Sequence, residues 1–305
     1  MKIVEADNLL GEGPQWNAAR QELVWIDGSK PHLWRWRAGA ARAEPWPLQR
    51  PPAAVLPLDD GRLVIAFRAG IAIAESFGAA IRPLELPGLD LGDERFNDAK
   101  VDARGRLWIG TLDRRLTRPI GRLYRIDDAS VAAMDSGFAL SNGIAWSPDA
   151  STMYFSESMD RVVHRYAFDV ESGGIRRLDP LMRVEGPPAK TDGLTVDAEG
   201  GIWCAIFGGR RIERRRPDGA LDRTIELPVT NPTSCTFGGA DLRTLFVTTA
   251  RYGLAPDALS REPHAGCLLA LDAGVQGIAE PQLASTNLLL AQPAARIHPP
   301  ESAHA

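Results

Sequence analysis

The most regular feature of the chain is a short apolar strand pattern that returns six times. Each copy is rich in aliphatic and aromatic side chains and follows a polar turn such as Asp60-Gly61 or Arg104-Gly105. The copies lie at residues 22–26, 62–66, 106–110, 152–156, 201–205 and 243–248. They are about 40 to 50 residues apart, which is the length of four short strands and their turns.

A second strand pattern follows each copy, and several of these segments alternate apolar with polar residues. That period is typical of an antiparallel strand with one buried face. The segments lie at 33–36, 70–73, 122–126, 162–166, 211–214 and 267–271. Six repeats of this size, without long amphipathic helices, predict an all-β fold, a six-bladed β-propeller. We expect a single propeller over residues 1–290 and a flexible tail at 291–305, where few residues can pack.

The stretch before each apolar strand has its own frame: a variable residue, a small residue, and then an apolar–any–apolar run. In a propeller the first strand of each blade lines the central channel, so equivalent positions in these strands converge on the axis. The variable positions therefore form a predicted ring, which consists of Glu12, Ala53, Asn97, Asn142, Asp192 and Thr233.

This predicted ring contains two carboxylates and two amides. Oxygen ligands favour hard cations such as Ca²⁺, Mg²⁺ or Mn²⁺, and Zn²⁺ also accepts carboxylate oxygen. The alternative is that the Asn-Gly and Asp-Gly pairs simply form turns. Because four potential ligands share one register of a circular repeat, we favour a site for one divalent metal ion, with Ca²⁺, Zn²⁺, Mn²⁺ and Mg²⁺ as the candidates.

Composition narrows the classes of protein further. The 305 residues are 44% hydrophobic and 24% charged, as in an ordinary globular protein. The net charge of −4 gives no general attraction to nucleic acid or anionic lipid, and no apolar run approaches the ~20 residues that cross a bilayer. Three scattered cysteines suit a reducing compartment. We expect a cytoplasmic monomer or weak oligomer that binds neither nucleic acid nor membrane.

Other catalytic motifs are missing from the sequence. There is no Gly-x-Ser-x-Gly elbow, and Gly11-Glu12-Gly13 lacks the third glycine and the helix of a dinucleotide site. The five histidines show no metal-binding spacing, and His164, which alternates within a strand, is interpreted as structural. The basic run at 210–216 is interpreted as a solvated blade surface, because no aromatic residues are interleaved with it.

Several segments together resemble the senescence-marker-protein/gluconolactonase family, which includes regucalcin and bacterial sugar lactonases. The matching segments are LGEGPQW (10–16), RFNDAKVD (95–102), SNGIAWSPD (141–149), TDGLTVDAEG (191–200), TSCTFGG (233–239) and TTAR (248–251). The resemblance covers roughly residues 5 to 275 and again implies a six-bladed propeller.

The resemblance also implies roles for individual residues. It implies that Glu12, Asn142 and Asp192 are the protein ligands of the metal, and that Arg95 and Asn97 contact a sugar lactone. The chain departs from the family in two places. Thr191 stands where the family usually has proline before the metal-site aspartate. The segment at 112–120 is short and basic compared with the longer acidic substrate loop of the animal members.

These roles lead to a mechanistic hypothesis for hydrolysis of a sugar lactone to the aldonic acid. The metal would polarise the lactone carbonyl and lower the pKa of bound water, while Asp192 would act as general base. Arg95 and Asn97 would orient the sugar. Asp113, which follows Gly110-Thr111, is a candidate for binding a sugar hydroxyl, with a solvated loop acid as the alternative.

Two rival functions remain open from the sequence. One is hydrolysis of another ester or a phosphotriester with the same metal chemistry. The other is a calcium-binding or interaction propeller without turnover, because a fold alone never fixes function. Arg95 and Asn97 argue against the second rival, since a pure metal site needs no guanidinium beside it.

Overall fold

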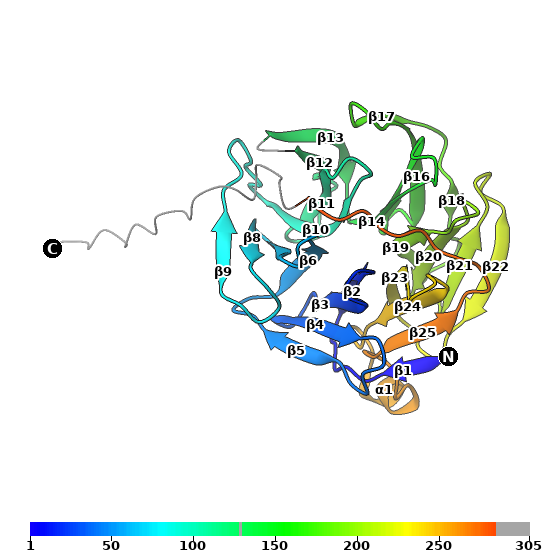
Figure 1. Cartoon of the computed structure of the whole chain (residues 1–305). Coiled ribbons are helices and arrows are strands. Elements are labelled where there is room, and N and C mark those ends of the chain that lie inside the picture. The colour runs from blue at the N-terminus through cyan, green and yellow to red at the C-terminus, as the bar shows by residue number, and fades with distance from the viewer. Residues whose placement is uncertain (128–129, 285–305) are drawn as a thin grey trace.

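The computed structural model describes residues 1–127 and 130–284. Its strands form six antiparallel sheets that surround a central channel like the blades of a propeller, as Figure 1 shows along the axis. The six-bladed, all-β prediction is therefore confirmed. The predicted tail at 291–305 lies outside the described residues. No helix in the described part of the chain is long and apolar enough to span a bilayer.

Each blade runs from an inner strand to an outer strand in sequence order, except the last. Blade one is β2 (Gly11–Asn17), β3 (Glu22–Asp27), β4 (His32–Arg37) and β5 (Glu44–Pro47). Blade two is β6 (Pro52–Pro57), β7 (Leu63–Phe67), β8 (Gly70–Ala74) and β9 (Ile81–Leu84). Blade three is β10 (Glu94–Val101), β11 (Leu107–Asp113), β12 (Gly121–Asp127) and β13 (Ser130–Phe138). Blade four is β14 (Ser141–Trp146), β15 (Thr152–Glu157), β16 (Val162–Asp169), β17 (Gly174–Arg177) and the short β18 (Met182–Arg183). Blade five is β19 (Lys190–Val196), β20 (Ile202–Phe207), β21 (Arg211–Arg215) and β22 (Leu221–Glu226).

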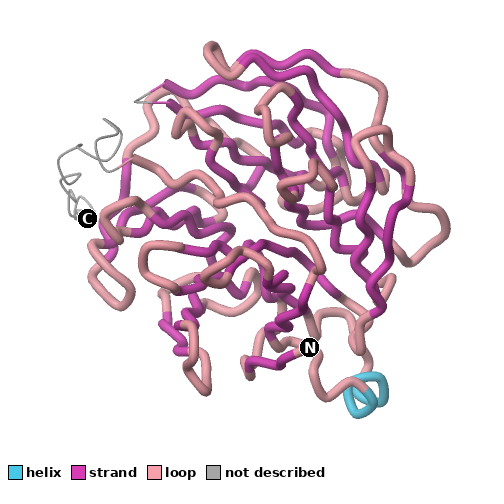
Figure 2. Tube along the Cα trace, turned by 45° about the vertical axis from the view of Figure 1, so that its right-hand side comes forward, coloured by secondary structure: helices cyan, strands magenta, loops and turns pink. Residues whose placement is uncertain are grey.

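The two ends of the chain meet in blade six. Its inner strands are β23 (Pro232–Gly238), β24 (Thr244–Thr249) and β25 (Leu268–Asp272), and its outer strand is the N-terminal β1 (Lys2–Val4). Strand β1 pairs antiparallel with β25, with Ile3 opposite Leu269. The helix α1 (Pro256–Arg261) precedes β25 and lies at the periphery, where Figure 2 shows it in cyan. Pairing between strands distant in sequence thus closes the ring and removes its open edge.

All six inner strands break register at the predicted ring positions. The strand pairing shifts within residues 12–15, 52–54, 96–99, 141–144, 191–194 and 232–234. Such β-bulges re-aim side chains locally and increase the twist of a strand. We call the end of the channel where the inner strands begin the upper end, and the opposite end the lower end.

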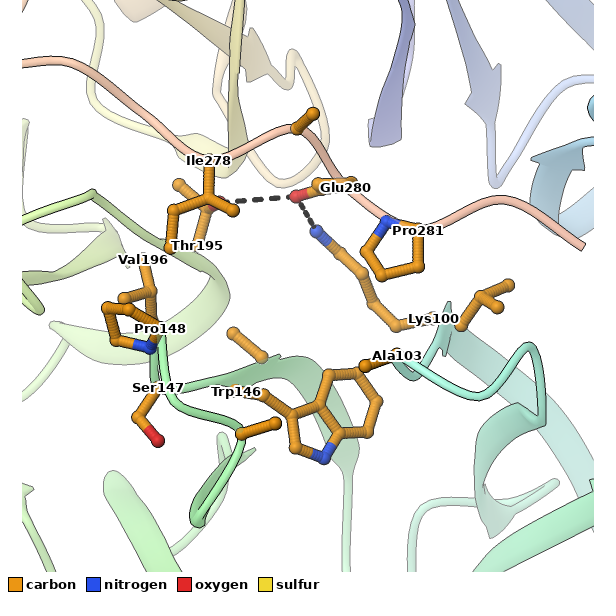
Figure 3. A pocket seen from close by; sticks show the side chains of 14 residues that line it. Lys100, Ala103, Trp146, Ser147, Pro148, Thr195, Val196, Ile278, Glu280 and Pro281 are labelled. Carbon is orange, nitrogen blue, oxygen red and sulfur yellow. Dashed lines mark hydrogen bonds and ion pairs between the residues drawn. The ribbon is translucent and has the colours of Figure 1, made fainter. Parts of the chain in front are cut away.

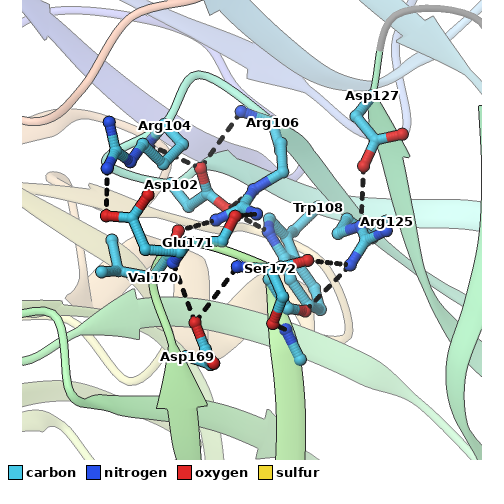
Figure 4. Close-up of polar contacts among 12 residues, drawn as sticks. Asp102, Arg104, Arg106, Trp108, Arg125, Asp127, Asp169, Val170, Glu171 and Ser172 are labelled. Atoms are coloured by element: carbon cyan, nitrogen blue, oxygen red, sulfur yellow. Dashed lines mark hydrogen bonds and ion pairs between the residues drawn. The ribbon is translucent and has the colours of Figure 1, made fainter.

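Apolar residues of neighbouring blades pack together, with Trp25, Trp108 and Trp203 fully buried. Near the lower end, an aspartate anchors the indole of the adjacent strand in two blades. Asp102 accepts hydrogen bonds from Trp108 Nε1 at 2.8 Å and from Arg106 Nε at 2.7 Å, as Figure 4 shows. These contacts stabilise the blade because the buried carboxylate has both a cation and N–H donors.

The same arrangement in blade five corrects the interpretation of the basic run at 210–216. Asp197 accepts from Trp203 Nε1 and from Arg214 Nε, each at 2.7 Å, and Arg214 is buried. Its neighbours Arg211 and Arg215 both pair with Glu213. Arg214 is therefore a buried, ion-paired part of the blade, whereas Arg210 and Arg216 at the ends of the run are exposed as expected.

A C-terminal strap, defined here as residues 273–284, crosses the lower end of the propeller. Figure 1 shows it in orange-red, running from β25 across the face of the neighbouring blades. It forms isolated bridges between Gly277 and Asp197 of blade five and between Leu283 and Leu58 of blade two. Leu283 is buried at its far end.

Beneath the strap lies a cavity of about 130 Å³. Figure 3 shows that Glu280 of the strap points toward Lys100 of β10, with which it forms an ion pair. The same carboxylate accepts a hydrogen bond from Thr195 Oγ1 at 3.1 Å. The strap therefore brings a charge of its own to the lower end of the channel, where it meets an opposite charge.

Candidate metal and substrate site

Four of the six predicted ring positions place side-chain oxygens at the upper end of the channel. Ala53 has no donor to offer. Thr233 uses its hydroxyl within the fold, bonding the Gly11 carbonyl oxygen at 2.5 Å and the Thr248 hydroxyl at 2.9 Å. The remaining donors come from blades one, three, four and five: Glu12, Asn97, Asn142 and Asp192.

Glycines next to these donors bring the inner strands close together. A Cβ atom on Gly193 would lie 2.0 Å from Ser234 Oγ, and one on Gly143 would lie 2.6 Å from the backbone nitrogen of Leu194. Any larger residue at either position would push neighbouring blades apart. The Asn-Gly and Asp-Gly pairs therefore lie in bulged strands, and their glycines allow close packing around the axis. They do not form the turns that were the alternative interpretation.

Hydrogen bonds orient both amides so that their oxygens remain free. Asn142 donates from Nδ2 to Ser158 Oγ at 3.2 Å, and Asn97 donates from Nδ2 to the Ser141 carbonyl oxygen at 2.8 Å. An amide whose nitrogen is held by an acceptor presents its carbonyl oxygen as a ligand or acceptor. Both side chains are thus suited to a cation or to a substrate hydroxyl.

The two ring carboxylates form no ion pair among the described residues, although the charge of Lys190 lowers the pKa of Asp192 in part. Burial raises the pKa of Glu12 well above its usual value, and the negative charges of Asp192 and Asp98 raise it further. Burial likewise raises the pKa of Asp192, with Asp98 adding to the effect. Asp192 is 5% exposed, and its Oδ1 has no hydrogen-bond partner within the described part of the chain. Such a group is costly to bury alone.

Asp98 belongs to the same acidic group, and the sequence analysis missed it. It is buried, and burial raises the pKa of its carboxyl to about 6 although Lys100 opposes the shift. One oxygen accepts from the Ala99 amide at 2.8 Å. A signal for it existed in the repeat: Asp98 occupies the register where Gly13, Gly143 and Gly193 stand in other blades, and a carboxylate there departs from the small-residue frame.

The chemistry of this donor set fits a divalent cation. Two acids and two amide oxygens are hard ligands, and the unpartnered Oδ1 of Asp192 together with the raised pKa values indicates missing positive charge. Across residues 1–127 and 130–284, no three His, Cys, Asp or Glu side chains form a metal cluster. That finding agrees with a site in which amides supply part of the coordination.

Arg95 lies next to this group in β10, two residues before Asn97. Its guanidinium has no ion pair or hydrogen bond to another residue that the structure describes. Burial lowers the pKa of Arg95 to about 10, nearby Arg68 lowers it too, and Tyr252 of the opposite blade raises it. A partly buried guanidinium that forms no ion pair among the described residues is suited to bind a polar ligand.

Asp113, the other predicted substrate contact, has a different place. It is fully buried at the end of β11, and its Oδ2 accepts from Thr117 Oγ1 at 2.8 Å and from the Arg118 amide at 3.0 Å. Although burial raises the pKa of Asp113, hydrogen bonds from Arg118 and Thr117 outweigh it and hold the pKa below its usual value. This geometry indicates that Asp113 shapes the basic loop, and it argues against both a sugar contact and a solvated acid.

Thr191, the residue that replaces the usual proline, also has a defined role. Its buried hydroxyl lies 3.3 Å from the carbonyl oxygens of both Glu157 and Val162 in blade four. It therefore ties β19 to the neighbouring blade directly beside Asp192. Threonine in place of the usual proline therefore still holds the backbone beside Asp192 in position.

Fold and site together define a six-bladed β-propeller with a group of acidic and amide side chains at the upper end of its inner strands. The profile described as SMP-30/Gluconolactonase/LRE-like region matches residues 10–251, and the chain belongs to this family. This membership confirms the resemblance inferred from the sequence segments.

Individual relatives match over nearly their whole length. The chain is 34% identical to 6-deoxy-6-sulfogluconolactonase of Pseudomonas putida, covering 92% of this chain and 97% of the relative. It is also 34% identical to L-arabinolactonase of Azospirillum brasilense, covering 93% and 95%. Among solved structures, the calcium-binding protein regucalcin from Agrobacterium tumefaciens superposes with a TM-score of 0.86 at 28% identity, covering 93% of this chain and 97% of that chain.

Proposed function

We propose that the protein is a metal-dependent lactonase that hydrolyses a sugar lactone to the corresponding aldonic acid. The observation that carries the proposal is the group of Glu12, Asp98 and Asp192, whose pKa values are raised by burial and by one another's charges. Arg95, which has no ion pair among the described residues, stands on the same strand as Asp98. The relatives named as sugar lactonases share this family and align over more than nine-tenths of the chain, which supports the same class of reaction.

Glu12, Asn142 and Asp192 would hold the cation. When bound, a divalent ion supplies Lewis acidity toward a carbonyl oxygen and lowers the pKa of water. Asp192 has a second task, because a carboxylate can bind through one oxygen and accept a proton through the other. Its Oδ1, which has no partner among the described residues, is the atom proposed to take the proton from water.

Hydrolysis then follows the ordinary course of ester opening. The water oxygen bonds to the carbonyl carbon, the bond between that carbon and the ring oxygen breaks, and the ring oxygen leaves as a hydroxyl after receiving a proton. Arg95 and Asn97 would orient the sugar by hydrogen bonds to its oxygens, and Asn97 is prepared for this by the bond that fixes its Nδ2. The two side chains stand one and three residues after β10 begins, so one rigid strand positions both.

A direct test is hydrolysis of five- and six-membered aldonolactones, followed with a pH indicator. We expect turnover after dialysis against Ca²⁺, Mn²⁺, Zn²⁺ or Mg²⁺, and its loss with a chelator. Turnover that persists at full rate after the chelator has removed all metal would contradict the metal role. Cation binding without hydrolysis of any lactone would instead support a calcium-binding propeller. Hydrolysis of other esters or phosphotriesters, without hydrolysis of lactones, would show that the substrate is not a lactone.

A further inference from the structure

A second arginine shares the upper rim with Arg95. Arg68 follows β7 in the exposed turn between β7 and β8, so it belongs to the blade next to that of Arg95. Its carbonyl oxygen accepts a hydrogen bond from the Phe96 amide at 3.0 Å, and its Nη2 donates to the Gly28 carbonyl oxygen at 3.3 Å. The backbone bond to Phe96 fixes the turn directly against the residue that follows Arg95.

Neither arginine is neutralised by the protein. Within the described residues, no carboxylate lies within ion-pair distance of Arg68 or Arg95, whereas two other arginines near the upper end, Arg118 and Arg251, are paired. Arg118 pairs with Asp93, and Arg251 pairs with Asp7. Two like charges that repel one another are therefore kept together without a counter-ion from the fold.

We propose that Arg68 and Arg95 together bind an anionic oxyacid group, a carboxylate, sulfonate or phosphate, carried by the lactone away from its ester. This substrate class rests on the proposed lactonase function and deepens it. Planar guanidinium groups match the oxygens of such anions through pairs of parallel hydrogen bonds. Two of them on adjacent blades supply a positive charge that a neutral sugar does not need.

The charge distribution along the channel explains why the anion would bind at the rim. Glu12, Asp98 and Asp192 lie in the bulges of the inner strands, here called the floor, and repel an anion. Arg95 near the start of β10 and Arg68 in the exposed turn next to it form the rim. A lactone with its anionic end at the rim therefore has its ester directed toward the floor. Arg95 would serve both the sugar and the anion, and Arg68 would serve the anion alone.

The test compares neutral glucono-1,5-lactone with its 6-phospho and 6-deoxy-6-sulfo derivatives in the metal-loaded protein. We expect kcat/KM to be higher for the anionic lactones, and Arg68→Gln to lower the anionic-to-neutral ratio by roughly 10- to 100-fold. Arg68→Lys, which keeps the charge but loses the planar fork, should recover part of that ratio. Arg216→Gln is the matched control, because it removes one positive charge from an exposed turn at the lower end, where Arg216 pairs with exposed Asp218.

A binding measurement separates this inference from the proposed reaction. Calorimetry of metal-free protein with the open-chain 6-phospho and 6-sulfo acids should show binding that Arg68→Gln weakens at least about tenfold. Equal kcat/KM for neutral and anionic lactones, with no effect of Arg68→Gln, would overturn the anion site and leave the lactonase intact. Absence of all lactone turnover would overturn the lactonase, while Arg68-dependent binding of the acids would still support the anion site. Binding of only one acid would name the anion that the rim accepts.

Discussion

Asp192 in strand β19 and Asp197 in the turn that follows it are buried to nearly the same extent. They differ in whether the protein supplies hydrogen-bond partners for their carboxylates. Asp197 is fully buried at the lower end and accepts hydrogen bonds from Trp203 Nε1 and Arg214 Nε, each at 2.7 Å. Asp192 is 5% exposed at the upper end, and one of its oxygens has no partner in the described part of the chain. Burial alone therefore does not identify a functional carboxylate. The unpartnered oxygen does, because a carboxylate that the described residues leave unsatisfied is available to a ligand.

Strand β10 repeats the contrast. Asp102, at its lower end, is held by Arg106 and Trp108, whereas Asp98, four residues earlier, has a raised pKa and faces the acidic group of the upper end. Two blades thus separate the roles of their aspartates in the same way. Asp102 and Asp197 at the lower end hold strands together, and Asp98 and Asp192 at the upper end belong to the acidic group.

The largest effect should come from Asp192→Asn, which keeps the size of the side chain and removes its charge. We expect kcat/KM for a sugar lactone to fall on the order of 10³-fold or more, because the variant lacks both the proton acceptor and a charged ligand. The folded state should be as stable as the parent or more stable, since like-charge repulsion with Asp98 is relieved. Lactone assays and thermal unfolding without added metal measure the two effects.

Near-parental turnover in Asp192→Asn would refute the role of this residue. Asp218→Asn, an exposed aspartate at the lower end, is the control for removing one negative charge, and it should leave turnover unchanged. A cation that raises the unfolding temperature of the parent should no longer do so in Asp192→Asn, because stabilisation by a ligand requires its binding site.

Asp197→Asn should show the reverse behaviour. It leaves Arg214 buried without its main partner, and truncating one member of a buried pair costs about 3–5 kcal/mol of unfolding free energy. Denaturant unfolding measures this loss. Asp222→Asn, which removes a more exposed partner of the same Arg214, should cost less than about 1 kcal/mol. Equal stability of the two variants would refute the claim that Asp197 is the main partner of Arg214 and a structural residue.

The smallest effect concerns His164, a titratable group among aromatic rings rather than acids. Its ring packs against Phe155 and Phe138, and burial, aided by Arg177, lowers its pKa to about 4. The folded state therefore resists protonation, so stability is complete above pH ~6.5 and declines as the pH falls toward 4. After discounting for its partly exposed ring, we expect about 2 kcal/mol of this decline to vanish in His164→Phe. Unfolding curves between pH 4 and 7 test it, and an unchanged slope would refute the assignment.

Much of the fold and part of the site could be predicted from the sequence. The repeat indicates six blades because strand periodicity and turns are local, and the shared register places Glu12, Asn142 and Asp192 on one axis. The same register did not reveal Asp98, because it occupies the position at which the other blades carry a small residue. The position of Asp113 after Gly110-Thr111 suggested either a sugar contact or a solvated acid, and the structure shows its carboxylate bonded within its own loop.

By itself, the sequence determined the number of blades, the position of their inner strands and the ring of oxygen donors, since each depends on a pattern within a single repeat. Only the tertiary structure decided which charges are neutralised. Glu280 meets Lys100 across 180 residues of sequence, and Arg214 meets Asp197 across 17. Arg68 and Arg95, on adjacent blades, form no ion pair among the described residues. Charge pairing depends on distances between separate segments, and no local pattern encodes those distances. The unpaired groups that mark the site are therefore visible only after the ring has closed.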